Sequence, residues 1–144
     1  MTGNILDISA RCVENDACIY RGKDMFVDIG ITNHQDTEIG FPLSFLRDTG
    51  PIIRLIDVRT GAETYVPNSA ADPALREDFT VLHPEQTVFL QWMIARSELE
   101  QLGGLPVDLH AEITVIARIQ VEGKVVDFRG VDTLRIASEG KTGS

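Results

Sequence analysis

The sequence has little of the residue types that usually carry chemistry or anchor a chain in a membrane. Its 144 residues include three histidines, two cysteines and 6% aromatic residues. No apolar run approaches the roughly 18–20 residues of a membrane helix, and no basic segment followed by an apolar run opens the chain, so we expect neither a membrane span nor a signal peptide. The protein is expected in the cytoplasm if Met1 is native, and in the periplasm or outside the cell if a signal peptide was removed.

Positive charge is also scarce. Thirteen basic residues face 22 acidic ones, which gives a formal net charge of −9. Nucleic acids and anionic membrane surfaces are bound through basic patches, so this balance argues against both as partners. The acidic residues are spread along the chain rather than gathered in a tail. A basic protein would be attracted by such a charge, and colloidal solubility is the simpler interpretation.

The patterns that identify common active sites are missing. His34 lies in a polar loop, His83 precedes a proline and His110 falls on the polar side of a strand, so nothing in the sequence brings the histidines together. No G-x-S-x-G elbow is present, and no glycine-rich segment opens a helix to hold phosphate. Short acidic runs at 36–38 and 76–78 lack the spacing of a calcium loop. We expect no catalytic residue, no cofactor and no metal site.

Cys12 and Cys18 are separated by five residues. In an oxidising compartment, a disulfide between them would close a short loop and attach the first strand to the following segment. In a cytoplasmic protein they would be two thiols, and Cys12 would behave as a small apolar residue. Carboxylates between them disfavour a reactive thiolate. Two cysteines without a nearby histidine do not make a zinc site.

The strongest pattern is an alternation of apolar and polar residues between positions 109 and 121. The odd positions are Leu, Ala, Ile, Val, Ala, Ile and Val, and the even ones are mostly polar, with Ile116 at their centre. A period of two over this length predicts a strand with one buried and one solvent-facing side. Glu122-Gly123 predicts a tight turn, and apolar residues at 126, 128, 134 and 136 predict the returning strand of a hairpin.

Further strands are predicted at 6–12, 25–33, 52–58, 63–66, 79–82 and 88–94. The last is apolar on both sides, with Trp92 in register with its inward residues, which is typical of a central strand. Pro42 limits the segment from Phe41 to Leu46 to an edge strand or a bulged connection. One helical turn is predicted at 73–77, and a short helix at 97–102 with Ser97 and Glu100 as its capping box. The sequence thus predicts an all-β, antiparallel sandwich of seven to nine strands with one short helix, as a single domain over 1–137 with a flexible tail at 138–144.

In a sandwich, the connections at 33–51 and 67–85 and the turn at 122–123 would gather at one end. Those at 13–24, 59–62 and 96–107 would gather at the other. Loops on a rigid scaffold often carry binding residues, and aromatic and arginine side chains are common interface anchors. The first end carries such residues, which are our candidate binding residues: Phe41, Phe45, Arg47, Tyr65, Asn68, Arg76 and Phe79. The alternative is that its three phenylalanines cap the core.

About two-thirds of the chain resembles a known layout. It runs FVDIGITNHQDTEIGF, IIRLIDVRTGAE, FTVLHPEQTVFLQW and, after a short helical segment, VDLHAEITVIA. This resembles immunoglobulin-like accessory domains of bacteria, including intracellular proteinase inhibitors of the BsuPI type and the pro-domains of deuterolysin-like metallopeptidases. Asn33 would end a strand before the polar loop, Asp57 and Gly61 would form a hairpin turn, and Phe79 would lead into the turn at 82–85.

The sequence departs from that layout at two places. Glu85 stands where a glycine is usual, and Asp108-Leu109-His110 replaces the Gly-x-Tyr that would open the penultimate strand. The resemblance implies an immunoglobulin-like module that performs no catalysis and engages another protein, with peptidases among the candidate partners. It assigns no catalytic residue.

The function expected from the sequence is therefore protein binding, as a peptidase inhibitor or a toxin-neutralising partner. The alternative is a carbohydrate-binding or structural accessory module of a larger surface or secreted assembly, which would bind through Trp92 or Tyr65. An enzyme is the least favoured class. The first strand and the Phe41–Leu46 segment could each pair with a second copy of the chain, because exposed sheet edges invite such pairing.

Overall fold

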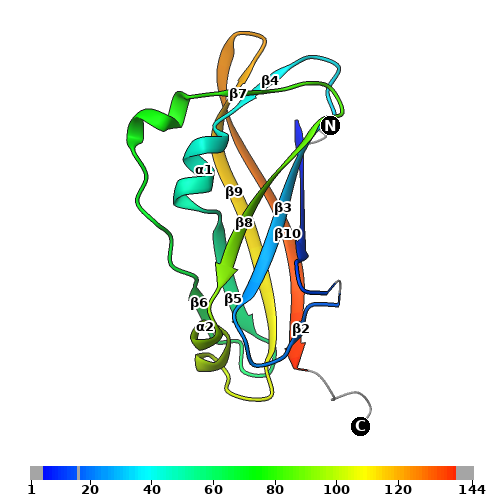
Figure 1. The fold of residues 1–144 in the computed structure, drawn as a ribbon, viewed down its shortest axis with the longest axis vertical. Coiled ribbons are helices and arrows are strands. Elements are labelled where there is room, and N and C mark those ends of the chain that lie inside the picture. Colours follow the sequence, from blue (N-terminus) through cyan, green and yellow to red (C-terminus); the bar gives the residue numbers. More distant parts are fainter. Residues whose placement is uncertain (1–4, 16, 139–144) are drawn as a thin grey trace.

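The computed structural model describes residues 5–15 and 17–138 and consists of two packed β-sheets (Figure 1). The smaller sheet has three antiparallel strands in the order β1-β3-β8. Their bounds are Leu6–Cys12 for β1, Met25–Asn33 for β3 and Thr87–Ile94 for β8. These strands follow the alternating segments of the sequence, so the strand predictions at 6–12, 25–33 and 88–94 are confirmed.

The larger sheet is built on the long hairpin of β9 and β10, which pair from Asp108 with Ala137 to Val121 with Lys124. Between them Glu122 and Gly123 have φ of 52° and 80°, as a two-residue hairpin turn of type I′ requires. The hairpin prediction is confirmed. The sheet consists of β2 (Ile19–Tyr20), β4 (Ile39–Phe41), β5 (Ile52–Asp57), β6 (Glu63–Tyr65), β7 (Thr80–Leu82), β9 (Asp108–Val121) and β10 (Lys124–Ser138).

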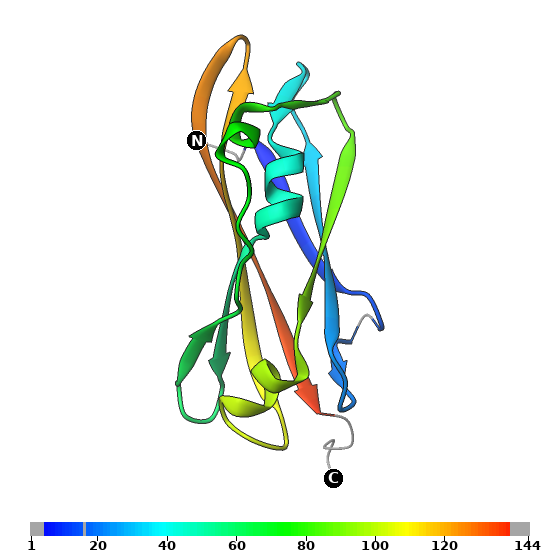
Figure 2. The same ribbon diagram turned by 60° about the vertical axis from the view of Figure 1, so that its left-hand side comes forward.

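One edge of β9 carries two short strands end to end. Gly40 of β4 pairs with Gln120, and Ile52 of β5 pairs with Thr114. Helix α1 (Leu43–Thr49) connects β4 to β5, so it lies beside the part of β9 that neither strand covers. Figure 2 shows α1 between the two layers of the sandwich.

Helix α1 corrects the expectation of an edge strand or bulged connection from Phe41 to Leu46. The strand ends at Phe41, and Pro42 stands at the helix N-terminus, where its missing N–H breaks no helical hydrogen bond. Its carbonyl accepts the first such bond, from the amide of Leu46. Leu43 and Leu46, three positions apart, are both buried, and that spacing puts them on one helical face.

Strand β8 is an edge strand, which corrects its prediction as a central one. Its inward residues Leu90 and Ile94 are buried, but Phe89 and Met93 on the other side are 48% and 43% exposed. Apolar residues on both sides of this strand therefore reflect an apolar outer surface rather than burial between neighbours. Trp92, on the inward side, is partly buried against the core.

Two further helical segments complete the described part of the chain. The 3₁₀ helix η1 spans Pro73–Glu77, as predicted. Helix α2 spans Arg96–Gln101 and follows Ala95 without a side-chain cap, so the capping box of Ser97 and Glu100 is wrong. With ten strands, two α-helices and one 3₁₀ helix in the described residues, the all-β sandwich is confirmed, but it has more strands and helices than predicted.

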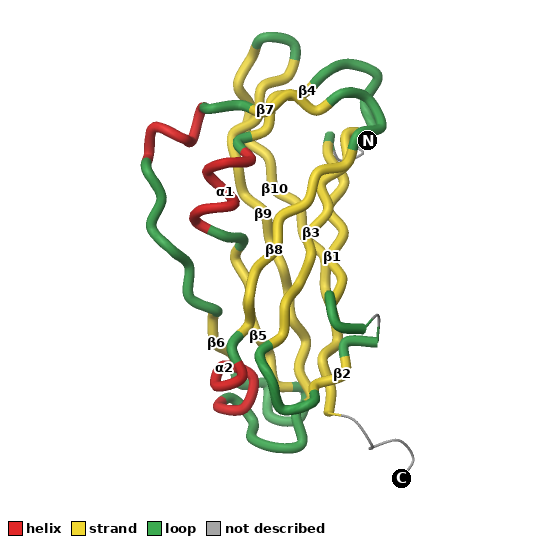
Figure 3. Tube along the Cα trace, viewed as in Figure 1, coloured by secondary structure: helices red, strands yellow, loops and turns green. Residues whose placement is uncertain are grey.

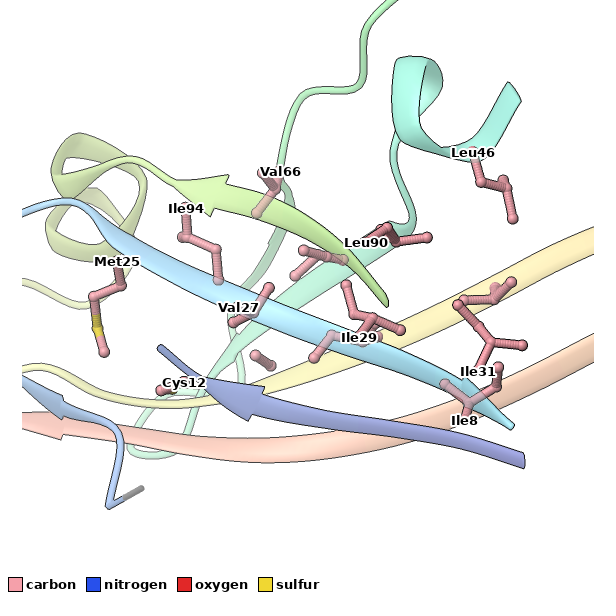
Figure 4. Close-up of a cluster of buried hydrophobic side chains, with 14 of the residues drawn as sticks. Ile8, Cys12, Met25, Val27, Ile29, Ile31, Leu46, Val66, Leu90 and Ile94 are labelled. Carbon is pink, nitrogen blue, oxygen red and sulfur yellow. The ribbon is translucent and has the colours of Figure 1, made fainter. Parts of the chain in front are cut away.

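A single core of aliphatic side chains lies between the sheets (Figure 4). It is formed by the inward positions of the alternating strands, such as Val27, Ile29 and Ile31 of β3. Helix α1 contributes Leu46 to the same core. Of the predicted tail at 138–144, Ser138 ends β10, and the remaining residues lie outside the described part of the chain.

A disulfide joins Cys12, the last residue of β1, to Cys18, which precedes β2. The Cα atoms of the two residues are 5.3 Å apart and both residues are buried. The bridge attaches the smaller sheet to the segment that pairs with the end of β10 in the larger one. Among the described residues, no helix is long and apolar enough to cross a membrane.

Candidate functional site

The connections gather at the two ends of the sandwich only in part, because the segment at 67–79, which was expected at one end, runs along the side of the molecule from one end to the other (Figure 3). The β9–β10 turn and the connections around β4 and β7 lie at one end, and the β5–β6 turn and the α2–β9 connection lie at the other. Helix α1 and η1 lie along the side of the sandwich below the first end. They stand beside β9, and together with β9 and β10 they line a surface hollow.

That hollow has a volume of about 600 Å³. A smaller one of about 220 Å³ shares Phe45 and Ile116 with it, so the two hollows are neighbours on either side of these two residues. We call the larger hollow the arginine groove. It is lined by Pro42, Phe45, Arg76, Ile116, Ala117, Arg118, Asp127, Phe128 and Arg129.

Strand register places the groove residues of β9 and β10. Ile116 and Arg118 occupy the polar, outward side of the β9 alternation, two residues apart. On β10, Arg129 pairs with Ile116 and Asp127 pairs with Arg118. Ile116 is 53% exposed, which makes it an apolar side chain in the middle of a charged surface.

The groove wall on the other side comes from two helical segments that are far apart in the sequence. Phe45 projects from α1 and is partly buried, and the guanidinium carbon of Arg76 on η1 lies 5.4 Å from the centre of its ring. This distance is within the range of a cation–π contact. The stacking gives Arg76 a defined position at the groove without engaging it in an ion pair.

The charges of the groove differ from those of the whole protein. Arg118 is 3.7 Å from a carboxylate oxygen of Glu77 and 3.9 Å from one of Asp127. Within the described ranges, neither Arg76 nor Arg129 has an ion pair with a carboxylate. The lining holds three arginines and one carboxylate, Asp127, and Glu77 adjoins it beside Arg118. These five groups together carry a charge of +1, in a chain whose net charge is −9.

The structure brings two of the predicted binding residues, Phe45 and Arg76, into this groove. Phe41 is fully buried in β4, which corrects its prediction as an exposed anchor, because its side chain caps the core. Phe79 is half-buried and packs on Gly40, where an added Cβ would lie 2.9 Å from the Cβ of Phe79. Tyr65, on β6, is 59% exposed and stands apart from the groove.

The two other predicted binding residues make hydrogen bonds that hold neighbouring segments. Arg47 of α1 donates to the carbonyl oxygen of Phe89 on the edge strand β8, at 2.9 Å. Asn68 donates to the carbonyl oxygens of Thr49 and Pro51, at 2.9 and 2.7 Å. Asn68 thereby ties the segment after β6 to the end of α1. Both side chains support the wall from which Phe45 projects.

Sequence reasoning missed the β9 and β10 side of the groove: Ile116, Arg118 and Arg129. One signal was present in the sequence, because Ile116 interrupts an otherwise polar row on the outward side of β9. The arginines carried no local signal, because charged residues on a solvent-facing strand side are ordinary. Only the strand register and the position of α1 place them around one hollow.

The three histidines lie in different surroundings. The Nε2 atom of His34 is 3.7 Å from a carboxylate oxygen of Asp7, and its Nδ1 atom is 3.8 Å from one of Glu85. The Nδ1 atom of His83 is 2.9 Å from a carboxylate oxygen of Glu38. His110 is exposed on β9, opposite Arg135. Among the residues that the structure describes, no group of three or more metal-binding side chains is found.

Asp57, at the end of β5, is a buried carboxylate whose contacts hold two connections together. Its Oδ2 accepts hydrogen bonds from the amide and the hydroxyl of Thr60, at 2.9 and 2.7 Å. The Thr60 hydroxyl bond is the main cause that lowers the pKa of Asp57 below its usual value. Arg59 is 3.7 Å from the other oxygen and donates to the carbonyl oxygens of Gly103 and Pro106, so this cluster joins the β5–β6 turn to the α2–β9 connection.

Comparisons with known proteins add similarities of shape alone. The sequence matches no protein-family model and no curated protein. An X-ray structure of a Northeast Structural Genomics Consortium target aligns with 95% of this chain and 88% of its own, at 11% identity and a TM-score of 0.46. A protein from Archaeoglobus fulgidus aligns with 93% of this chain and 97% of its own, at 10% identity and a TM-score of 0.42.

A β-glucosidase from Listeria innocua in complex with glucose aligns with 94% of this chain but 16% of its own, at 12% identity and a TM-score of 0.42. None of these three structures reaches a TM-score of 0.5, and neither family nor function is taken from them.

Proposed function

We propose that this protein is a non-catalytic module that binds another protein through the arginine groove. The observation that carries the proposal is the exposed Ile116 beside Phe45, at a hollow whose arginines include two without a carboxylate partner in the described structure. Aromatic and arginine side chains are enriched at protein interfaces, where apolar anchors of one partner fill concave sites of the other. The wall of the groove is held by Arg47 and Asn68, which favours a preformed site.

The scaffold that we propose is immunoglobulin-like. The order β1-β3-β8 in one sheet and β5-β9-β10 in the other corresponds to strands A-B-E and C-F-G of that fold. In this interpretation β9 and β10 are the F and G strands. The resemblance of the sequence to BsuPI-type proteinase inhibitors and deuterolysin-like pro-domains agrees with this order.

Peptidase inhibition is the most specific form of the proposal, and neutralisation of a toxin is a close variant. Both require tight contact with a folded partner and no chemistry in this chain. A groove with an apolar centre would accept one side chain of the partner as an anchor, while the surrounding strand face excludes water from the contact.

The test uses the full chain and two matched variants. Ile116→Asp places a charge at the centre of the groove, and Val58→Asp makes the same kind of change at an exposed residue beyond the end of β5. Each protein is assayed against a panel of peptidases and used to capture partners from native lysate. We expect inhibition or a specific partner with the wild type and Val58→Asp, and its loss with Ile116→Asp. No inhibition and no captured partner at micromolar protein would refute protein binding.

The alternative function, carbohydrate binding, is favoured by one observation, the exposure of Tyr65. Trp92 offers it less support, because its ring is partly buried and its Nε1 atom donates to the carbonyl oxygen of Pro67 at 3.4 Å. Binding to a glycan array that is abolished by Tyr65→Ala and kept by Ile116→Asp would favour this alternative over protein binding.

A further inference from the structure

We propose that the arginine groove recognises an acidic segment of the partner protein, in which one apolar side chain lies between carboxylates. This inference rests on the proposed function, because it names the chemistry of the partner at the same site. It runs opposite to the expectation from net charge, which favours a basic partner. Three features of the groove carry it: its apolar centre, its unpaired arginines and the arrangement of the two.

The apolar centre is formed by Ile116 and Phe45, which come from β9 and α1. Ile116 is more than half exposed, and Phe45 is partly buried with one face covered by Arg76. A branched or aromatic side chain of a ligand would remove both from water. An anion without an apolar part would leave this surface exposed, so the groove does not fit a simple anion such as phosphate.

The arginines determine the sign of the ligand charge. The carboxylate that lines the groove, Asp127, and the neighbouring carboxylate of Glu77 both lie within 4 Å of Arg118. Arg76 and Arg129 are left without a carboxylate in the described structure, although the chain has nine more acidic than basic residues. A guanidinium binds a carboxylate through two parallel hydrogen bonds, so carboxylates are the natural complement of these two side chains.

The length of the charged ligand is limited by the rest of the molecule. A long polyanion such as nucleic acid would extend beyond the groove and meet a protein surface of the same sign. A short acidic segment is influenced mainly by charges within a Debye length, about 8 Å at physiological salt. Among the residues that line the groove, three arginines face one carboxylate, Asp127.

The arrangement predicts the order of side chains in the segment. Arg129 pairs across the strands with Ile116, on the β10 side of the groove, and Arg76 stacks on Phe45, on the helical side. A segment that crosses the groove therefore meets one arginine before and one after the apolar centre. The matching pattern is acidic, apolar, acidic.

The test uses three fluorescent peptides of equal length and the full protein. The first has a central leucine flanked by aspartate and glutamate, the second has the leucine flanked by lysine, and the third keeps the acids and replaces leucine by glycine. Affinity is measured by fluorescence anisotropy at low and high salt, and the contact is mapped by amide chemical shifts. We expect measurable binding of the first peptide alone, with shifts centred on Ile116 and Arg129.

The protein variants separate this inference from general electrostatics. Arg129→Glu should weaken the first peptide by about tenfold or more, because it replaces the complementary charge by a like charge. Lys23→Glu makes the same charge change at an exposed turn before β3 and should have little effect. Binding of the lysine peptide as tightly as the first, equal loss in both variants, or chemical shifts outside the groove would overturn the inference. If decanoate binds with the same affinity as the first peptide, the inference is also overturned, because the site would then suit a small amphiphile.

The two proposals can fail separately. If a protein partner is captured and its binding is lost in Ile116→Asp but unchanged in Arg129→Glu, protein binding stands and the acidic segment is refuted. If the first peptide binds as expected but no protein is captured or inhibited, the groove chemistry stands and the proposed function is refuted.

Discussion

The indole ring of Trp92 lies directly against the backbone of Gly50. A Cβ atom built on Gly50 would be 2.5 Å from Cζ2 of Trp92, which is closer than two non-bonded carbon atoms can approach. Gly50 ends α1, and its amide donates to the carbonyl oxygen of Leu46. The absence of a side chain at this residue lets the edge strand β8 of the smaller sheet close against the segment that leads into β5 of the larger one.

Gly50→Ala is expected to destabilise the fold by about 2–4 kcal/mol. The residue has φ 88° and ψ 165°, a conformation that only glycine adopts readily, and the new methyl group would also displace the Trp92 ring. Gly22→Ala is the control, since Gly22 has φ 83° but no atom within 4 Å of its added Cβ. Urea unfolding followed by tryptophan fluorescence measures both variants. Equal losses would show that packing against Trp92 contributes nothing.

Reduction of the disulfide between Cys12 and Cys18 is expected to lower the free energy of unfolding by about 2 kcal/mol. The estimate follows from the entropy that a cross-link across so short a loop removes from the unfolded chain. Urea unfolding with and without a reducing agent measures the change. The double variant Cys12→Ala and Cys18→Ala should have the lower stability and should not respond to reducing agent. Wild-type stability that is unaffected by complete reduction would contradict the prediction.

Arg47→Ala is expected to promote self-association. The Arg47 side chain occupies the carbonyl oxygen of Phe89, on the outer edge of β8, and Phe89 itself is exposed. Removing the Arg47 side chain leaves the carbonyl oxygen of Phe89 unpaired on an apolar edge strand, and such edges pair with other strands. Light scattering over a concentration series measures the effect. Lys124→Ala, which removes a charge at the tip of the β9–β10 hairpin, should remain like the wild type; association of both variants would point to net charge instead.

Asp57 is expected to make part of the stability dependent on pH. The hydrogen bonds from Thr60 lower the pKa of Asp57 in the folded state, so its carboxylate stabilises the fold at neutral pH. That contribution is lost as the pH falls below about 4 towards the lowered value. Asp57→Asn should reduce stability near neutral pH and flatten the acid part of the stability curve. Asp127→Asn, at a side chain that is 97% exposed, should do neither.

Much of the fold could be predicted from local patterns. The alternation at 109–121, the turn at Glu122-Gly123 and the strands at 6–12 and 25–33 were recognisable, because each buries one side and the burial recurs every second residue. Pro42 misled the interpretation, since a proline is compatible with both the end of a strand and the start of a helix. The helix is favoured because it buries Leu43 and Leu46 on one face.

The sequence alone determined that this chain forms a β-sandwich, because the period of its apolar residues is a local property that no distant contact needs to supply. The strands pair antiparallel as predicted, except that β2 pairs in parallel with the end of β10. Only the tertiary structure decided that β8 is an edge strand and that α1 stands beside β9 between β4 and β5. It also decided where binding is proposed. Phe45, Arg76, Ile116 and Arg129 meet at one groove because strand register and helix packing bring them together, and those depend on residues far apart in the chain.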